Sequence, residues 1–283
     1  MSVLYLVGTP IGNLEDMSPR ALEVLESVDF IAAEDTRVTL KLLNRFGIKK
    51  PMVSYYQHNL RERGEEILRR IQAGESCAIV TDAGMPCVSD PGEGLVDLCH
   101  GAGVPVRVVP GPTAAMSALA ASGLPTGRFA FEGFLSVKPS SRRQRLEEVR
   151  DDPRTLIFYE APHKLLRTLE DMSAAFGGER RITLCREITK IYEEYIRTTL
   201  SGALELCREK EPRGEYVLIV EGAPPREAPA LTLPQAAELA AQMAGCGVSL
   251  SEAAKSVAAD SGFKKGEIYR AALELLRPGE NGS

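Results

Sequence analysis

Residues 77–92 read Cys77-Ala-Ile-Val-Thr-Asp-Ala-Gly-Met-Pro-Cys-Val-Ser-Asp-Pro-Gly92, an apolar run that leads into a loop rich in Gly, Pro and Asp. The run Cys77–Thr81 is continuous rather than alternating, which predicts a strand buried on both faces, as in a parallel sheet. Asp90 followed by Glu93 has the spacing of a capping box and predicts a helix that ends near His100. The stretch therefore has the form of a strand, a loop and a helix.

Similar units lie on both sides of this stretch, and their alternation predicts a largely parallel α/β sheet. Apolar runs predict further strands over residues 3–7, 30–33 and 106–109. Ser18 and Thr36 are candidate N-caps for two helices. Two more helices are expected over residues 62–73 and 114–121.

The second half of the chain repeats this alternation less regularly. Strands are expected over residues 156–159, 182–185, 195–199 and 216–220, with helices near residues 142–150, 164–176 and 203–209. The last strands lie close together in the sequence, which predicts antiparallel pairing within a mixed sheet.

Breaks in the pattern divide the chain into four parts. We expect a first α/β domain over residues 1–122, a second over 123–222, a linker over 223–230 and a helical tail over 231–283. Short helices are expected near residues 235–243, 252–259 and 266–276. Residues 250–273 have the form of a helix–turn–helix.

Composition places the chain among soluble globular proteins, with 44% hydrophobic and 26% charged residues. Apolar runs fall well short of the roughly 20 residues of a membrane span, and the N-terminus lacks a basic start, so we expect a cytoplasmic protein without membrane contact. Six Cys without a Cys-x-x-Cys pair, and only three His, argue against a metal site. The net charge of −5 means that contact with RNA requires local basic patches.

Three loops rich in Gly or Pro follow predicted strands, over residues 8–14, 81–92 and 110–114. Ligands of parallel sheets bind at the carboxyl ends of the strands, where these loops gather, so we expect a small-molecule site. The alternative is that they are ordinary tight turns. The chain has no P-loop motif and no full Gly-x-Gly-x-x-Gly, so spacing alone does not identify the ligand.

Five stretches carry a family resemblance: Thr9-Pro-Ile-Gly-Asn-Leu14, Ala33-Glu-Asp-Thr-Arg37, Thr81–Gly92, Pro110-Gly-Pro-Thr-Ala114 and Phe158-Tyr-Glu-Ala-Pro-His163. Through them, residues 1–222 resemble the tetrapyrrole-methylase superfamily of S-adenosylmethionine-dependent methyltransferases, and within it the branch that modifies ribosomal RNA. Pro10 stands where the superfamily usually has a middle glycine, and this form favours an RNA substrate over a porphyrinoid. Thr81 stands where Ser is commoner, which is a mild change.

The resemblance implies two α/β domains with S-adenosyl-L-methionine bound in the cleft between them, and a homodimer. It also implies 2′-O-methylation of a cytidine in the decoding region of 16S rRNA in the small ribosomal subunit. The cofactor-binding residues that it implies are Gly8, Pro10, Ile11, Asp82, Gly84, Met85, Pro86, Val88, Ser89, Thr113, Ala114, Pro162 and Thr189. The positive charge on the sulfonium group of the cofactor disappears during methyl transfer, so no metal ion is required to stabilise charge.

Glu34, Asp35 and Arg37 are the candidate catalytic residues, because they follow a predicted strand at the edge that bears the loops. A ribose hydroxyl is a poor nucleophile and benefits from a general base. We expect one carboxylate to accept the 2′ proton, the other to hold Arg37, and Arg37 to contact phosphate. The alternative is a helix start with acidic first-turn residues and a salt bridge. Glu160 is the next candidate base, and His163 is a weaker one.

Candidate RNA-binding residues are Lys138, Arg142, Arg143 and Arg145, together with Lys264 and Lys265 in the tail. The alternatives are a solvated helix start for the first group and a packing role for the tail, whose residues 226–283 have a net charge of −1. Two rival functions stay open. One is methylation of a corrin or porphyrin precursor on the same fold, and the other is a ribosome-binding module without turnover.

Overall fold

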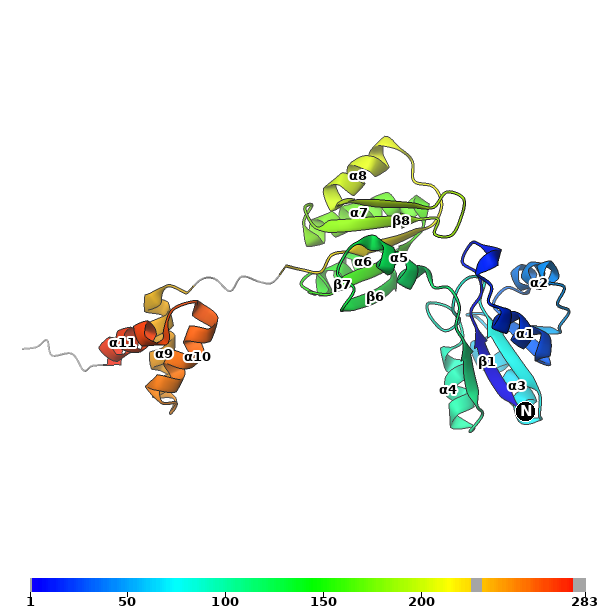
Figure 1. Ribbon diagram of the computed structural model, residues 1–283, viewed down its shortest axis with the longest axis horizontal. Coiled ribbons are helices and arrows are strands. Elements are labelled where there is room, and N and C mark those ends of the chain that lie inside the picture. The colour runs from blue at the N-terminus through cyan, green and yellow to red at the C-terminus, as the bar shows by residue number, and fades with distance from the viewer. Residues whose placement is uncertain (1, 225–230, 277–283) are drawn as a thin grey trace, which may run out of the picture. The chain divides into compact units, whose positions relative to one another are not determined.

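The computed structural model describes residues 2–224 and 231–276 (Figure 1). Residues 1–223 form one compact unit and residues 224–283 form a second. Within the described ranges, every helix is too short or too polar to cross a membrane.

The first sheet has five parallel strands in the order β3-β2-β4-β1-β5. The strands are β1 (Val3–Val7), β2 (Phe30–Ala33), β3 (Met52–Ser54), β4 (Ser76–Val80) and β5 (Val106–Val109). Side chains of β1, β2 and β4 alternate between two buried clusters, one on each face of the sheet. Helices α1 (Pro19–Ser27) and α2 (Thr36–Arg45) pack on one face, and α3 (Leu60–Gln72) and α4 (Glu93–Gly101) on the other. A 3-10 turn, η1 (Leu14–Asp16), lies in the loop after β1.

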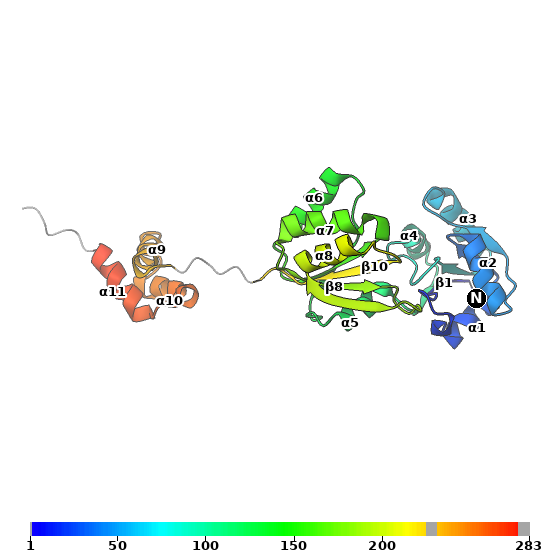
Figure 2. The same ribbon diagram turned by 90° about the horizontal axis from the view of Figure 1, so that it is seen from above.

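The second sheet is mixed, in the order β6-β7-β10-β8-β9, as the close spacing of its last strands predicted. Only β6 and β7 pair in parallel among the described strands of this sheet. The strands are β6 (Phe129–Phe134), β7 (Thr155–Glu160), β8 (Arg181–Arg186), β9 (Glu194–Thr199) and β10 (Tyr216–Val220). Helices α6 (Pro139–Glu148), α7 (Pro162–Phe176) and α8 (Leu200–Glu209) cover one face (Figure 2).

Helix α5 (Ala114–Ser122) covers the other face of the second sheet. The boundary between the two α/β layers therefore lies before α5 and not after it, where the sequence predicted it. Ala115, Ala118 and Leu119 pack against Ile157 and Ile219. A boundary at residue 123 would separate this helix from the sheet on which it buries its small apolar side chains. The second α/β layer therefore begins with α5, directly after the third loop.

Two predicted helix caps are wrong. Asp35, not Thr36, caps α2, and its carboxylate accepts a hydrogen bond of 2.8 Å from the Arg37 backbone N–H. The N-cap of α4 is Gly92, with φ +144° and no side-chain hydrogen bond, so the Asp90 and Glu93 capping box does not form. Asp90 instead lies at the wall of a cavity described below.

The second unit contains α9 (Leu233–Gly245), α10 (Leu250–Ser261) and α11 (Lys265–Leu276), close to the predicted helices. Its core is built mainly from alanines, which let the helices approach closely. Helices α10 and α11 have the predicted helix–turn–helix order, with Gly262 between them. Most of the expected linker, residues 225–230, lies outside the described residues.

Candidate functional site

The three loops expected to bind a ligand contact one another at the carboxyl edge of the first sheet. The backbone N–H of Thr9 donates to the Gly84 carbonyl at 2.9 Å, and the N–H of Gly84 donates back at 3.2 Å. The Thr9 hydroxyl also donates to the Thr81 carbonyl at 3.2 Å. A Cβ on Gly8 would lie 2.7 Å from the Cα of Gly111, so the first and third loops are in backbone contact. The loops therefore form one rigid platform.

A cavity of about 550 Å³ lies over this platform and reaches the second sheet, and we call it the interdomain cavity. Its walls come from the second and third loops, from Ile11, and from residues at the ends of β7, β8 and β10. Most residues expected to bind a cofactor line it: Ile11, Asp82, Gly84, Met85, Val88, Ser89, Thr113, Ala114 and Pro162.

The other residues expected to bind a cofactor lie behind or beside this cavity. Gly8 faces Met85 and Gly111 and supports the platform from within. Pro86 is buried. The hydroxyl of Thr189 accepts a hydrogen bond of 3.1 Å from the Asn13 backbone N–H, which joins the first loop to the β8–β9 loop.

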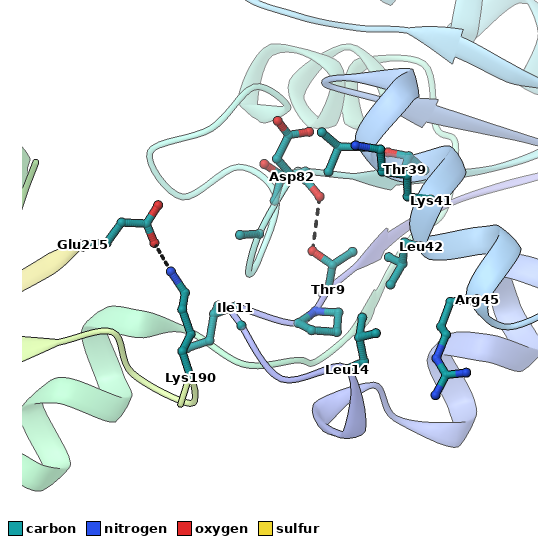
Figure 3. A pocket seen from close by; sticks show the side chains of 15 residues that line it. Thr9, Ile11, Leu14, Thr39, Lys41, Leu42, Arg45, Asp82, Lys190 and Glu215 are labelled. Carbon is teal, nitrogen blue, oxygen red and sulfur yellow. Dashed lines mark hydrogen bonds and ion pairs between the residues drawn. The ribbon is translucent and has the colours of Figure 1, made fainter. Parts of the chain in front are cut away.

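Pro10 lines a second cavity, of about 430 Å³, which we call the α2 cavity (Figure 3). Ile11, Asp82 and Lys190 belong to the walls of both cavities, so the two adjoin. In Figure 3, Lys190 and its partner Glu215 lie across the cavity from the α2 residues. The Lys190 ammonium is 2.8 Å from the Glu215 carboxylate.

Three carboxylates, those of Glu34, Asp82 and Asp90, line the interdomain cavity close to Thr81. The Thr81 hydroxyl donates a hydrogen bond of 2.6 Å to Oε2 of Glu34. Burial, reinforced by the negative charge of Glu34, raises the pKa of Asp90 to about 6. The same two causes raise the pKa of Asp82. The sequence does not identify Asp90 as a residue of the cavity, because Asp90 and Glu93 have the spacing of a capping box at the start of a helix.

The structure separates Glu34 from the other two candidate catalytic residues. Asp35 and Arg37 form a two-point ion pair, with donor–acceptor distances of 3.0 and 2.7 Å. These hydrogen bonds lower the pKa of Asp35 to about 2. Neither Asp35 nor Arg37 is among the described residues that line the two cavities. Glu34 is thus the candidate base, and Asp35 is the acid that holds Arg37.

Glu160 and His163 both line the interdomain cavity, but Glu160 already has two hydrogen-bond donors. Its carboxylate accepts from the Ala161 backbone N–H at 2.9 Å and from the Thr168 hydroxyl. It is buried, with 4% of its surface exposed. These contacts brace the start of α7, so Glu160 is less suited than Glu34 to accept a substrate proton.

The three arginines of the basic stretch of α6 pair with acidic side chains, and the RNA-binding role of this stretch stays a prediction. Arg142 is buried and pairs with Asp171 at 2.6 Å, and Arg143 binds the same carboxylate at 2.9 Å. Arg145 pairs with Glu132 at 2.7 Å and with Glu148. Lys138 is exposed at the start of the helix. The α6 arginines therefore fasten the helix to α7 and β6.

Lys264 and Lys265 are exposed at the start of α11, as the helix–turn–helix pattern predicted. The backbone N–H of Lys264 donates to Glu267 at 2.9 Å. Among the described residues, no group of three or more His, Cys, Asp or Glu has the geometry of a metal site.

The raised pKa of Asp90 predicts a pH-dependent effect on stability. Because the pKa rises from 3.8 to about 6 on folding, the stability contributed by the protonated carboxyl is fully present below about pH 4 and is lost as the pH rises through about 6. Asn mimics the protonated form, so Asp90→Asn is expected to raise the free energy of unfolding near pH 7 by about 1–2 kcal/mol, allowing for solvent screening. Urea unfolding near pH 7 and near pH 4 checks this, and an equal effect at both pH values would contradict it.

The chain matches one protein family and is similar to several named proteins over most of its length. Residues 3–204 match the family described as Tetrapyrrole (Corrin/Porphyrin) Methylases. A protein of Synechocystis sp., named ribosomal RNA small subunit methyltransferase I, is 45% identical over 279 residues, which cover 99% of this chain and 100% of that protein. A protein of the same name from Thermotoga maritima is 45% identical over 222 residues, which cover 78% of this chain and 99% of that protein.

Solved structures show the same fold. A uroporphyrin-III C-methyltransferase from Thermus thermophilus, complexed with S-adenosylhomocysteine, superposes with a TM-score of 0.53 and 22% identity. The superposition covers 77% of this chain and 96% of that one. With two α/β sheets, loops at the carboxyl edge and a family match over most of its length, the chain belongs to the tetrapyrrole methylase family.

Proposed function

We propose that this chain is an S-adenosyl-L-methionine-dependent methyltransferase that methylates the ribose 2′ oxygen of a cytidine in the decoding region of 16S rRNA. The observation that carries the proposal is the 45% identity, over 99% of the chain, to a protein named ribosomal RNA small subunit methyltransferase I. Glu34 at the wall of the interdomain cavity supports an alcohol nucleophile, because such a nucleophile needs a base. The family resemblance extends the proposal to a homodimer in the cytoplasm.

The interdomain cavity fits the proposed cofactor. Its volume of about 550 Å³ lies within the roughly 300–1,000 Å³ of typical small-molecule sites. Gly84, with φ +88°, lines the cavity wall without a side chain, and Asp82 supplies acceptors for hydroxyl or ammonium groups. The second loop and the Thr113–Ala114 turn would hold the cofactor. When bound there, it supplies a methyl group on a positively charged sulfur.

The chain's own part in the reaction is to align the ribose hydroxyl and to take its proton. Alignment matters because methyl transfer is an in-line displacement. Glu34 is oriented by the Thr81 hydroxyl at 2.6 Å, which leaves its other carboxylate oxygen to accept the 2′ proton.

Transfer of tritium from labelled cofactor tests the substrate class. The full chain is incubated with purified small ribosomal subunits, with a tetrapyrrole precursor, and with neither. The proposal predicts label in the RNA of the small subunit. Label in the tetrapyrrole would favour the corrin or porphyrin alternative, and no transfer at all would favour a binding module without turnover.

Deletion of residues 224–283 tests the proposed RNA contact of the tail. We expect cofactor affinity to be unchanged, because the described cofactor cavity is built within residues 1–223. Methylation of small subunits should be reduced several-fold through KM, because Lys264 and Lys265 are lost. A larger loss is not expected, because a relative can be similar to this chain without matching all of it. The match to the T. maritima relative leaves about a fifth of this chain uncovered, a fraction similar to the size of the tail. Full activity of the shortened chain would assign the tail to packing instead.

A further inference from the structure

Residues 36–61 contain six basic residues and no Asp or Glu, although the whole chain has 39 acidic residues. The six are Arg37, Lys41, Arg45, Lys49, Lys50 and Arg61. The first three lie on α2 at intervals of four, and such residues share one face of a helix. The chain therefore carries a basic stripe along α2, although its net charge is negative.

Lys41 and Arg45 of this stripe line the α2 cavity (Figure 3). Both are exposed, and neither has an acidic partner within the described parts of the chain. In contrast, Lys190 on the opposite wall is neutralised by Glu187 and Glu215. Two unpaired cations one turn apart at a cavity favour an anionic ligand, such as a phosphate group.

The rest of the α2 cavity suits a nucleotide rather than a simple anion. Leu14 and Val38 line it and are 43% and 38% exposed, so apolar surface is open to a base or a ribose. The hydroxyl-bearing Thr9 and Thr39 supply polar groups beside them. Cationic and apolar surface side by side matches the phosphate, sugar and base of nucleic acid.

The position of this cavity links it to the proposed chemistry. Ile11 and Asp82 form part of its wall and part of the wall of the interdomain cavity. An RNA strand held in the α2 cavity would therefore pass directly beside the proposed cofactor. The α6 arginines differ from Lys41 and Arg45, because each of them is paired with an acidic side chain, Asp171 or Glu132.

We propose that Lys41 and Arg45 bind the phosphodiester backbone of the RNA next to the methylated nucleotide, and that the α2 cavity receives that strand. This inference rests on the proposed function and adds the residues that hold the substrate. Lys41 and Arg45 position the RNA and take no part in proton transfer.

The test compares the wild-type chain with the double variant Lys41→Ala/Arg45→Ala on purified small subunits. KM for methyl transfer is expected to rise about tenfold or more, with kcat close to wild type, because uniform binding energy is lost. The slope of log affinity against log salt should fall by about 1.4–1.8, the loss of two phosphate contacts. The single variant Lys41→Arg, with Arg45 unchanged, keeps both positive charges. It should therefore bind small subunits with most of the wild-type affinity. Unchanged cofactor affinity by calorimetry shows that the variant is folded.

A matched control removes the same charge elsewhere in the first domain. Arg61→Ala/Arg69→Ala acts on exposed residues of α3, outside the α2 stripe. Arg61 differs from Lys41 and Arg45 because it pairs with Glu65 on the same helix. This control should keep the wild-type KM and salt slope. Equal KM and equal slope in all three proteins would overturn the inference. Filter binding of small subunits gives the same comparison without turnover, so failure of the wild-type chain to transfer methyl groups would count against the proposed function alone.

Discussion

Glu34→Gln is expected to lower the single-turnover rate of methyl transfer to small subunits by about 10²–10⁴, the usual value of general-base assistance. Gln keeps the size of the side chain and accepts the hydrogen bond from the Thr81 hydroxyl, but it cannot take the 2′ proton. Rapid-quench measurements with saturating cofactor give the rate. Cofactor affinity, measured by calorimetry, should change little.

Asp35→Asn is the matched control for this prediction. It removes a carboxylate from the adjacent residue, but that carboxylate caps α2 and pairs with Arg37. Its pKa of about 2 makes it a weak base. We therefore expect a much smaller loss of rate than in Glu34→Gln. A normal rate in Glu34→Gln together with a large loss in Asp90→Asn would transfer the role of base to Asp90.

Gly84→Val is expected to weaken cofactor binding by about 10- to 100-fold, the cost of overpacking a close-fitting site. The residue has φ +88°, a region that β-branched side chains rarely adopt, and its Cβ would lie 3.4 Å from Cγ2 of Ile11. The Cβ itself would be in van der Waals contact with the cavity wall, so the two Cγ atoms of valine would occupy space that glycine leaves free. Isothermal titration with S-adenosylmethionine measures the affinity.

Gly103→Val controls for backbone strain alone. Gly103 has φ +68°, but a Cβ there would meet nothing within 4 Å. Both variants should lose about 1–3 kcal/mol of stability from backbone strain. Only Gly84→Val should lose cofactor affinity. Wild-type affinity in Gly84→Val would mean that the second loop does not hold the cofactor.

The sequence predicts the strands well where apolar runs are long and buried on both faces. Val3–Val7, Phe30–Ala33 and Tyr216–Val220 have the expected bounds. The strand Met52–Ser54 was missed because it has three residues at the edge of the sheet. The strand Phe129–Phe134 was missed because Glu132 and Gly133 interrupt its apolar pattern.

Side-chain partners that lie far apart in the sequence could not be predicted at the candidate sites. The α6 arginines resemble a basic patch until Asp171 and Glu132 are brought beside them by the fold. Asp90 has the spacing of a helix cap, and its interaction with Glu34 cannot be predicted because the two residues lie far apart in the sequence. Lys41 and Arg45 were overlooked although the signal was available, since residues 36–61 contain no acid to neutralise them.

Analysis of the methylated nucleoside identifies the atom of the RNA that receives the methyl group. Small subunits labelled by the full chain are digested to nucleosides and to alkali-resistant dinucleotides, which form only where the ribose 2′ oxygen is blocked. We expect the label in 2′-O-methylcytidine, in one alkali-resistant dinucleotide from the decoding region. Label on a base, or on the ribose of another nucleoside, would contradict this expectation.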